Sequence, residues 1–225
     1  MPTILAIDTS SPVCSVALAA TGDVVTRQTP AERQAAQKLL PLIESLFTDH
    51  SITLANIDAI AVVTGPGSFT GMRIGVGVAQ GLSFAANCPV IGVSSLALTA
   101  VAGQRKLEPS ITHWLVAEPA RNGEVYFAAY NVVAKGQAEL MGKEQVARPE
   151  ALQIPVIESS WNSAGAAWDD ELPDKLGVAR AEYYDSATVD MTALCEIAGY
   201  RLGSGQYQPD GAVLPNYIKD QLDYS

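Results

Sequence analysis

Apolar and polar residues alternate in short runs at the start of the chain and later recur at helical spacing, which predicts a mixed α/β protein. In residues 32–49 the apolar positions share one face of a helix, and these are Ala35, Leu39, Leu42, Ile43 and Leu46. Pro41 falls among them and should kink or split that helix. The expected elements of the first half are strands Thr3–Thr9, Val13–Ala20 and Asp23–Thr29, helix Glu32–Asp49, strand Ala59–Val63, helix Thr70–Ala86, strand Val90–Val93 and helix Leu96–Gln104.

The same kind of pattern begins again after residue 110. The expected elements there are strands His113–Glu118, Glu124–Asn131 and Ala138–Glu144, a short helix from near Pro149 and a longer helix over Ala187–Leu202. A turn at Arg121–Gly123 should join the first two of these strands. Strands followed by alternating helices and strands, twice over, predict two similar α/β halves that face each other across a cleft. We expect the boundary within Gly103–Ser110, giving domains 1–106 and 107–225, with the end of the chain free to return to the first.

Charge and composition narrow the class of protein. The 225 residues are 48% hydrophobic and 17% charged, which is typical of a compact globular chain. The formal net charge of −10 argues against a large phosphate-binding surface, so any nucleic acid would have to be held mostly by a partner.

Location follows from the N-terminus and the cysteines. No basic stretch followed by an apolar core opens the chain, and its three cysteines are far apart, so a reducing cytoplasm is expected. The charge-free run Ile74–Gln104 is broken by Gln80, Asn87 and Pro89 into pieces too short to span a bilayer, and is expected to be buried core.

The stretch Val63–Gly77 contains five glycines between a strand and a helix, where a backbone turns sharply or approaches a ligand closely. It lacks the lysine of a phosphate-binding P-loop. It also fails the GxSxG pattern of a nucleophile elbow, because Pro66 and Thr70 occupy the two glycine positions around Ser68. Ser68 is instead expected to cap the following helix.

Four segments carry a resemblance to a known family. These are ILAIDTSSPVCSVAL at the start, GPGSFTGMRIGVGVAQGLSFA in the middle, PVIGVSSL after it and GEVYFAAY later. Together they resemble the TsaB family, also called YeaZ, over most of the chain and most strongly before residue 100. The resemblance implies an actin-like, sugar-kinase-type fold (ASKHA, RNase H-like) with two duplicated halves.

The resemblance also implies a function. Members of this family act in making threonylcarbamoyladenosine on tRNAs that read codons starting with A. There they are non-catalytic partners of a related TsaD subunit, with TsaE as a further ATPase component. ATP and a metal ion are therefore expected in the partner subunits, and no cofactor is assigned to this chain.

One nucleotide-binding candidate remains in the turn Asp8–Thr9–Ser10–Ser11. Nucleotide-binding members of the fold superfamily carry an Asp-x-Gly turn there, whose glycine lets backbone N–H groups wrap phosphate oxygens. Ser10 stands in place of that glycine. The alternative is that Asp8 and the neighbouring hydroxyls only satisfy a turn.

The glycines inside the second helix each cost about 1 kcal/mol relative to alanine, which close packing would offset. Gly71, Gly75, Val78 and Leu82 share one stripe, and Gly77, Gly81, Ile74 and Ala85 share a second. One stripe is expected to pack on the chain's own sheet and the other on another subunit, unless both lie in the core. By resemblance, this surface would serve both a homodimer and a heterodimer with TsaD. The expected interface residues are Leu39, Leu42, Ile43, Leu46, Gly71, Arg73, Ile74, Gly75, Val78 and Leu82.

No metal site or catalytic residue is expected. The TsaD relative holds its metal with an HxxxH pair, and in this chain Ser95 and Thr99 occupy those positions. The two histidines, His50 and His113, lie elsewhere. The three cysteines, Cys14, Cys88 and Cys195, are expected to be small buried hydrophobes rather than nucleophiles.

Two departures from the family pattern stand out. The family has Asp-Ala-Arg before GEVY, whereas this chain reads Glu118-Pro119-Ala120-Arg121. Arg121 is retained, and Glu118 offers a carboxylate one residue earlier. The closing YIK at Tyr217–Lys219 replaces the family's YLR.

Two other functions stay open beside the scaffold. One is a stand-alone ATPase or kinase of the same fold, which Ser10 and the missing loop lysine argue against. The other is a peptidase acting on its partner, for which the sequence offers no triad and no metal motif.

Overall fold

The computed structural model describes residues 2–107, 110–158, 160–168, 171–178, 183–184, 189–208 and 212–218. Contacts within the chain group these residues into two compact units. The first takes Met1–Ser95 and Val189–Asn216, and the second takes Leu96–Thr188 and Tyr217–Ser225, in each case for the described residues. No helix in the described ranges is long and apolar enough to cross a membrane.

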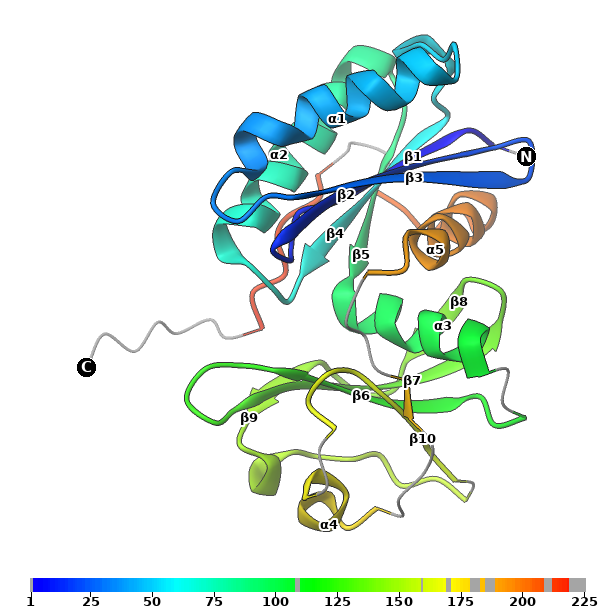
Figure 1. Cartoon of the computed structure of the whole chain (residues 1–225). Coiled ribbons are helices and arrows are strands. Elements are labelled where there is room, and N and C mark those ends of the chain that lie inside the picture. The colour runs from blue at the N-terminus through cyan, green and yellow to red at the C-terminus, as the bar shows by residue number, and fades with distance from the viewer. Residues whose placement is uncertain are drawn as a thin grey trace. The chain divides into compact units, whose positions relative to one another are not determined.

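The first unit is built on a five-stranded sheet in the order β3-β2-β1-β4-β5 (Figure 1). The first three strands pair antiparallel, whereas β4 and β5 run parallel to β1. The elements are β1 (Ile4–Asp8), β2 (Val13–Ala20), β3 (Asp23–Pro30), α1 (Ala35–Asp49), η1 (Leu54–Asn56), β4 (Ala59–Gly65), α2 (Phe69–Ala86), β5 (Val90–Ser94) and α5 (Met191–Ser204).

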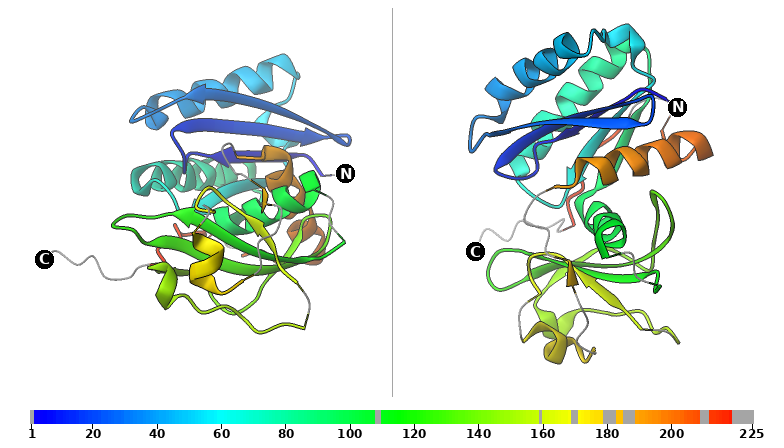
Figure 2. Two further views of the ribbon diagram at one scale, coloured as in Figure 1. Left: turned by 60° about the horizontal axis from the view of Figure 1, so that its bottom comes forward. Right: turned by 45° about the vertical axis from the view of Figure 1, so that its right-hand side comes forward.

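The two faces of this sheet carry side chains of different size. On one face, larger residues such as Leu5, Ile7 and Val62 pack against α1 and α2. The other face is lined by small residues, namely Ala6, Ala17, Ala19, Ala59 and Ala61. Helix α5 covers this alanine face, where a Cβ added at Gly199 would lie 3.8 Å from Cδ1 of Ile4 (Figure 2).

The second unit repeats the topology of the first. Its sheet has the order β11-β10-β6-β7-β8, with β9 pairing on β7. As in the first sheet, three successive strands pair antiparallel and two further strands add in parallel to the first of them. The elements are β6 (His113–Pro119), β7 (Val125–Ala134), β8 (Gln137–Leu140), β9 (Gln145–Ala147), η2 (Pro149–Ala151), β10 (Asn162–Ala164), α4 (Leu172–Leu176) and β11 (Tyr183–Tyr184). The expected duplication is confirmed by this shared strand order.

Each unit is completed by a helix that follows the last strand of the other. Helix α3 (Ser95–Leu107) comes directly after β5, yet from Leu96 onward it belongs to the second unit. There Gly103 lets the Trp114 ring lie close, because a Cβ at Gly103 would be 2.6 Å from Cζ3 of that ring. Conversely, α5 follows β11 and packs on the first sheet. The first stretch of the first unit therefore ends at Ser95, eleven residues before the expected boundary at residue 106, and the chain returns to this unit with Val189–Asn216.

Several expected elements differ in detail. The first long helix starts at Ala35 rather than Glu32 and continues through Pro41 as one element, with Pro41 on its exposed side. The expected strand 138–144 is replaced by β8 and β9. The expected helix near Pro149 is a single 3-10 turn, η2. The last helix begins at Met191, and positions 187–188 of the expectation lie outside the described residues.

Candidate docking surface on helix α2

Helix α2 begins with the cap that its sequence predicts. The Ser68 hydroxyl accepts a hydrogen bond from the backbone N–H of Gly71 over 3.2 Å. A serine at this position satisfies one of the N–H groups that a helix start leaves without an intrahelical partner. The prediction that Ser68 is a helix cap is confirmed.

The glycines of the loop and of the first turns of α2 face the turn between β1 and β2 of the same chain. A Cβ at Gly67 would lie 2.6 Å from the Ser10 carbonyl oxygen, and one at Gly71 would lie 1.9 Å from that of Thr9. A Cβ at Gly75 would lie 2.4 Å from the Thr9 hydroxyl oxygen. These three glycines are therefore required because two segments of one chain come within backbone contact.

Hydrogen bonds fix the same approach. The Ser68 N–H donates to the Ser10 carbonyl over 2.7 Å, and the Thr9 hydroxyl donates to the Gly71 carbonyl over 2.7 Å. The glycine loop and the start of α2 are thus packed directly against the chain's own β1–β2 turn. The expectation that Gly71 and Gly75 meet another subunit is corrected, because both are buried against Thr9.

Asp8 closes this turn from inside. Its Oδ1 accepts hydrogen bonds from the Ser10 N–H over 2.8 Å and from the Ser10 hydroxyl over 2.6 Å. Its Oδ2 and the hydroxyl of Ser15, its register partner on β2, are buried with no hydrogen-bond partner among the described residues. Burial raises the pKa of Asp8, and the two bonds from Ser10 offset part of this rise. These contacts favour the interpretation that the carboxyl satisfies a turn.

Replacing Asp8 with asparagine should stabilise the chain at pH 7, because the amide keeps an oxygen for both Ser10 bonds and carries no charge. Because the pKa of Asp8 is higher in the folded state, the folded wild type binds the proton more tightly than the unfolded chain does. The resulting stabilisation of the wild type is fully present below the pKa of the unfolded state, near 3.8, and is lost as the pH rises through the pKa of the folded state. Urea unfolding between pH 4 and pH 7 measures the difference. We expect the gain from Asp8→Asn to shrink toward pH 4, and a gain that does not change with pH contradicts the assignment.

The opposite side of α2 faces solvent. Gly77 and Gly81 are exposed, and a Cβ at either would meet no atom of the described chain within 4 Å. The Phe84 side chain is 91% exposed, Phe69 is 46% exposed, and the Arg73 guanidinium lies 3.8 Å from the centre of the Phe69 ring. We call Phe69, Arg73, Gly77, Gly81 and Phe84 the outer stripe of α2.

The ten expected interface residues separate into three groups. Leu39, Ile43 and Leu46 of α1 lie in the core together with Gly71 and Gly75, so this half of the expectation is corrected. The apolar residues of α1 recur at helical spacing because this face of the helix packs against the chain's own sheet. Half-buried residues between the two helices are Leu42, Ile74, Val78 and Leu82. Arg73 alone of the ten is exposed.

An apolar groove runs beside the outer stripe. It measures about 510 Å³ and lies between α1, η1 and the second half of α2. Leu40, which is 52% exposed, borders it together with Phe47, Leu54 and Leu82. This part of the surface therefore offers apolar contact area that the chain itself leaves uncovered.

Ser95 and Thr99 occupy the positions of the metal-binding histidines of the TsaD relative, and both donate side-chain hydrogen bonds within their own unit. In the first unit, the Ser95 hydroxyl donates to the Pro66 carbonyl over 2.7 Å. In the second, the Thr99 hydroxyl donates to Oε1 of Glu118 over 3.3 Å, and the Ala166 N–H donates to Oε2 over 3.2 Å. Within the described ranges no three His, Cys, Asp or Glu side chains gather in a way that could hold a metal ion.

The segment that departs from the family's Asp-Ala-Arg ends in a tight hairpin. Both Glu118 oxygens are engaged as described, so its carboxylate is committed to the packing of the second unit. Arg121 is exposed, and the turn after it has positive φ at Asn122 (59°) and Gly123 (73°), the geometry that an Asn-Gly pair favours. The turn expected at Arg121–Gly123 is confirmed. Of the closing YIK, Lys219 lies outside the described residues.

The cysteines sit in environments that disfavour the thiolate. Burial raises the pKa of Cys14 to about 11, with the Asp8 carboxyl contributing and Lys38 opposing. Burial also raises the pKa of Cys195 to about 12, and the pKa of the half-buried Cys88 is raised for the same reason. A raised pKa keeps each thiol protonated at neutral pH, and the thiolate is the reactive form. The environments of all three cysteines are therefore those of unreactive side chains that pack in the protein.

Known proteins resemble the chain over most of its length. Residues 21–175 match the family model TsaD: tRNA N6-adenosine threonylcarbamoyltransferase. The tRNA threonylcarbamoyladenosine biosynthesis protein TsaB of Escherichia coli (strain K12) is 40% identical over 167 residues, which cover 73% of this chain and 71% of that protein.

Two solved structures from Pseudomonas aeruginosa superpose on nearly all of the chain, each at 34% identity. One, described as an uncharacterized protein with similarity to peptidase YEAZ, gives a TM-score of 0.85 and covers 97% of this chain and 100% of that one. The other, described as YeaZ, gives 0.82 with coverages of 96% and 100%.

These likenesses and the repeated strand order define the class first: the chain is a TsaD-like α/β protein with two duplicated, actin-like halves. Within that class, it belongs to the TsaB (YeaZ) family.

Proposed function

We propose that this chain is a non-catalytic scaffold and activating subunit in the synthesis of threonylcarbamoyladenosine on tRNAs that read codons starting with A. Its partners would be a TsaD-like, metal-bearing subunit that transfers the group and a TsaE-like ATPase. The relatives named tRNA threonylcarbamoyladenosine biosynthesis protein TsaB support the pathway. The match to the TsaD family model supports a partner of related fold.

The outer stripe of α2 is the observation that carries the scaffold role. Each glycine within a helix costs about 1 kcal/mol relative to alanine, and nothing in the described chain requires Gly77 or Gly81 to lack a side chain. Another backbone approaching from outside would require it, as small residues four positions apart do between helices of membrane proteins. Phe84 would then become buried at the same contact.

The same surface suits two assemblies. A second copy of this chain can meet it about a two-fold axis, and a related TsaD-like subunit can present a similar helix pair in its place. Homodimer and heterodimer are therefore expected to compete for one surface. The half-buried residues Leu42, Ile74, Val78 and Leu82 would border this contact, and the core residues Leu39, Ile43 and Leu46 would support it from beneath.

Catalysis is assigned to the partners. The β1–β2 turn packs directly against the glycine loop, and this close contact argues against a stand-alone ATPase or kinase that would bind a nucleotide phosphate there. Asp8, Thr9 and Ser10 are all engaged in that packing. With a net charge of −10, the chain would contact tRNA only through the complex, in the cytoplasm.

Reconstitution with each subunit omitted in turn tests the proposal. The complete mixture of this chain, a TsaD-type subunit, a TsaE-type subunit and an activated threonylcarbamoyl donor should modify tRNA. Omission of this chain should abolish the activity, and this chain alone should show none. Calorimetry with ATP and the isolated chain addresses the alternative. Tight ATP binding by this chain, or full activity without it, contradicts the scaffold role.

A further inference from the structure

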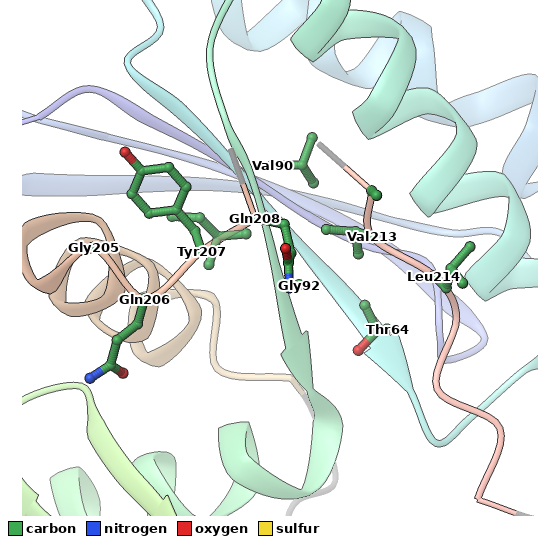
Figure 3. A pocket seen from close by; sticks show the side chains of 11 residues that line it. Thr64, Val90, Gly92, Gly205, Gln206, Tyr207, Gln208, Val213 and Leu214 are labelled. Carbon is green, nitrogen blue, oxygen red and sulfur yellow. The ribbon is translucent and has the colours of Figure 1, made fainter. Parts of the chain in front are cut away.

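Buried hydroxyl groups in the first unit usually donate to a backbone carbonyl. Thr64 is an example: it borders a hollow of about 500 Å³ beside β5 (Figure 3), and its hydroxyl donates to the Val93 carbonyl over 3.2 Å. Two buried atoms depart from this pattern, because Oδ2 of Asp8 and the Ser15 hydroxyl have no hydrogen-bond partner among the described residues. A buried polar atom without a partner costs free energy, so these two atoms require an explanation.

Asp8 and Ser15 lie directly opposite each other on β1 and β2. They are register partners of an antiparallel pair, and both side chains are buried. Because side chains alternate along a strand, they share the face of the sheet that carries Ala6 and Ala17, which also pair with each other. The Cβ atoms of directly opposed residues are about 4.5–5.5 Å apart, a separation at which a carboxyl and a hydroxyl can share a hydrogen bond. The two atoms without a partner are therefore placed to bond to each other.

The two oxygens of the Asp8 carboxyl have different surroundings. Oδ1 accepts both hydrogen bonds from Ser10, whereas Oδ2 is buried and accepts none in the described chain. An ionised carboxyl would place part of its charge on Oδ2, where neither water nor a donor compensates it, and a buried carboxyl in that position usually takes up a proton instead. A proton on Oδ2 makes this oxygen a donor, and the Ser15 hydroxyl has lone pairs that can accept it.

The charged groups around Asp8 leave its carboxyl without a cation in the described part of the chain. Strand β4 carries no titratable side chain, and β2 carries only Cys14, whose pKa the Asp8 carboxyl helps to raise. The titratable residues of the two helices that pack on β1 are Arg73 of α2 and, on α5 and its cap, Asp190, Cys195, Glu196, Tyr200 and Arg201. The two cations among them are engaged elsewhere, one over the Phe69 ring and the other at the Gly92 carbonyl. Burial and the bonds from Ser10 are therefore what act on the Asp8 carboxyl.

We propose that Asp8 is a neutral carboxylic acid in the folded chain at pH 7, and that its Oδ2 donates a hydrogen bond to the Ser15 hydroxyl. The pair forms a pH-sensitive lock on the β1–β2 turn. Through Oδ1 the same carboxyl holds Ser10, whose carbonyl accepts the Ser68 N–H at the start of α2. The lock therefore extends from β2 through Asp8 to the first turn of α2. Loss of the proton at higher pH would leave an uncompensated charge in this packing and loosen the turn and the start of the helix together.

Infrared difference spectroscopy of the full chain at pH 7 tests the proposal, because the C=O stretching band of a protonated carboxyl is distinct from the bands of a carboxylate. The difference between the wild type and Asp8→Asn should contain one band of a carboxylic acid. Ser15→Ala should keep this band and shift its frequency, because the acid loses its acceptor. Asp58→Asn is the matched control: Asp58 also accepts a backbone N–H, from Thr3 over 2.7 Å, but it is exposed, so its replacement should remove no acid band.

Urea unfolding provides a second measurement that needs only Asp8→Asn. The unfolded wild type releases the proton near pH 3.8, whereas the folded wild type keeps it. The unfolding equilibrium constant of the wild type should therefore rise by about tenfold per pH unit between pH 5 and pH 7, relative to that of Asp8→Asn. At pH 7, Ser15→Ala should raise the constant of the wild type by roughly fivefold through the lost hydrogen bond.

An acid band that is lost in Asp8→Asn, shifted in Ser15→Ala and unchanged in Asp58→Asn supports the lock. Absence of an acid band from the difference between the wild type and Asp8→Asn overturns the proposal, and so does a ratio of their unfolding constants that stays flat between pH 5 and pH 7. A band that Ser15→Ala leaves at its original frequency shows that Ser15 is not the acceptor, which also overturns the lock. Circular dichroism of each variant shows whether it is folded.

Discussion

A Gly71→Ala variant of this chain is expected to lose at least about 3 kcal/mol of folding stability, a large part of the roughly 5–15 kcal/mol that a domain has. The added Cβ would lie 1.9 Å from the Thr9 carbonyl oxygen and 3.0 Å from its carbon. Both are backbone atoms held by the hydrogen bonds across the turn, so neither can move aside without breaking that packing. Urea unfolding followed by circular dichroism measures the loss.

Gly77→Ala is the matched control on the same helix. A Cβ at Gly77 would meet nothing within 4 Å in the described chain, so only helix propensity should act. We expect this variant to gain up to about 1 kcal/mol. If Gly71→Ala proves as stable as Gly77→Ala, then the glycine loop and the β1–β2 turn do not approach each other as closely as described.

Phe84→Asp is expected to reduce affinity for the TsaD-type subunit by at least about 30-fold, near 2 kcal/mol, while the isolated chain stays folded. The side chain is 91% exposed, so removing it costs the monomer little, whereas a carboxylate at a closed contact would lose its hydration. Gly77→Trp should act in the same direction by preventing close approach of a backbone. Titration of the purified subunits measures both.

Gly203→Trp serves as the control for the tryptophan variant. Gly203 is also an exposed helical glycine, and a Cβ there would meet nothing within 4 Å of the described residues. It lies on α5, on the other side of the sheet, and is expected to bind the partner normally. Equal affinity of Gly77→Trp and Gly203→Trp would mean that no partner backbone packs against the glycines of the outer stripe.

Leu39 and Gly75 are unsuitable positions for testing docking, although the sequence assigns both to an interface. Leu39→Glu and Gly75→Trp look from the sequence like interface variants that leave a folded chain. Leu39 is fully buried, and a Cβ at Gly75 would lie 2.4 Å from the Thr9 hydroxyl oxygen, so both changes would disturb the fold itself. Loss of binding in either variant would say nothing about docking.

Local patterns predict what depends on neighbours in the sequence. The Ser68 cap, the Asn122–Gly123 turn and the apolar face of α1 all follow from spacing over a few residues, and all are present. The purpose of the glycines does not follow in this way. Thr9 and Gly71 are 62 positions apart, so nothing near Gly71 indicates which backbone it must accommodate.

The second half is harder to predict because its elements are short. β10 has three residues and β11 has two, which is too few for any periodicity to show. Residues 212–216 carry no periodic signal either, since only Val213 among these five residues is buried. An apolar helix face also looks the same whether it covers the chain's own sheet or a partner, which is why the sequence alone assigns Leu39, Ile43 and Leu46 to the wrong contact.

The exchange of closing helices between the units has a consequence for synthesis on the ribosome. The alanine face of the first sheet is covered by α5, so it stays open until Met191–Ser204 has been made, although its last strand ends at Ser94. Domains usually fold in turn as they emerge, but here the earlier unit cannot be completed until the chain has been made as far as Ser204. Nascent chains that stop between Ser94 and Met191 would expose the alanine face of the first sheet to chaperones and proteases. A gene cut after Ser95 would likewise encode a first half that lacks α5, the helix that covers this face.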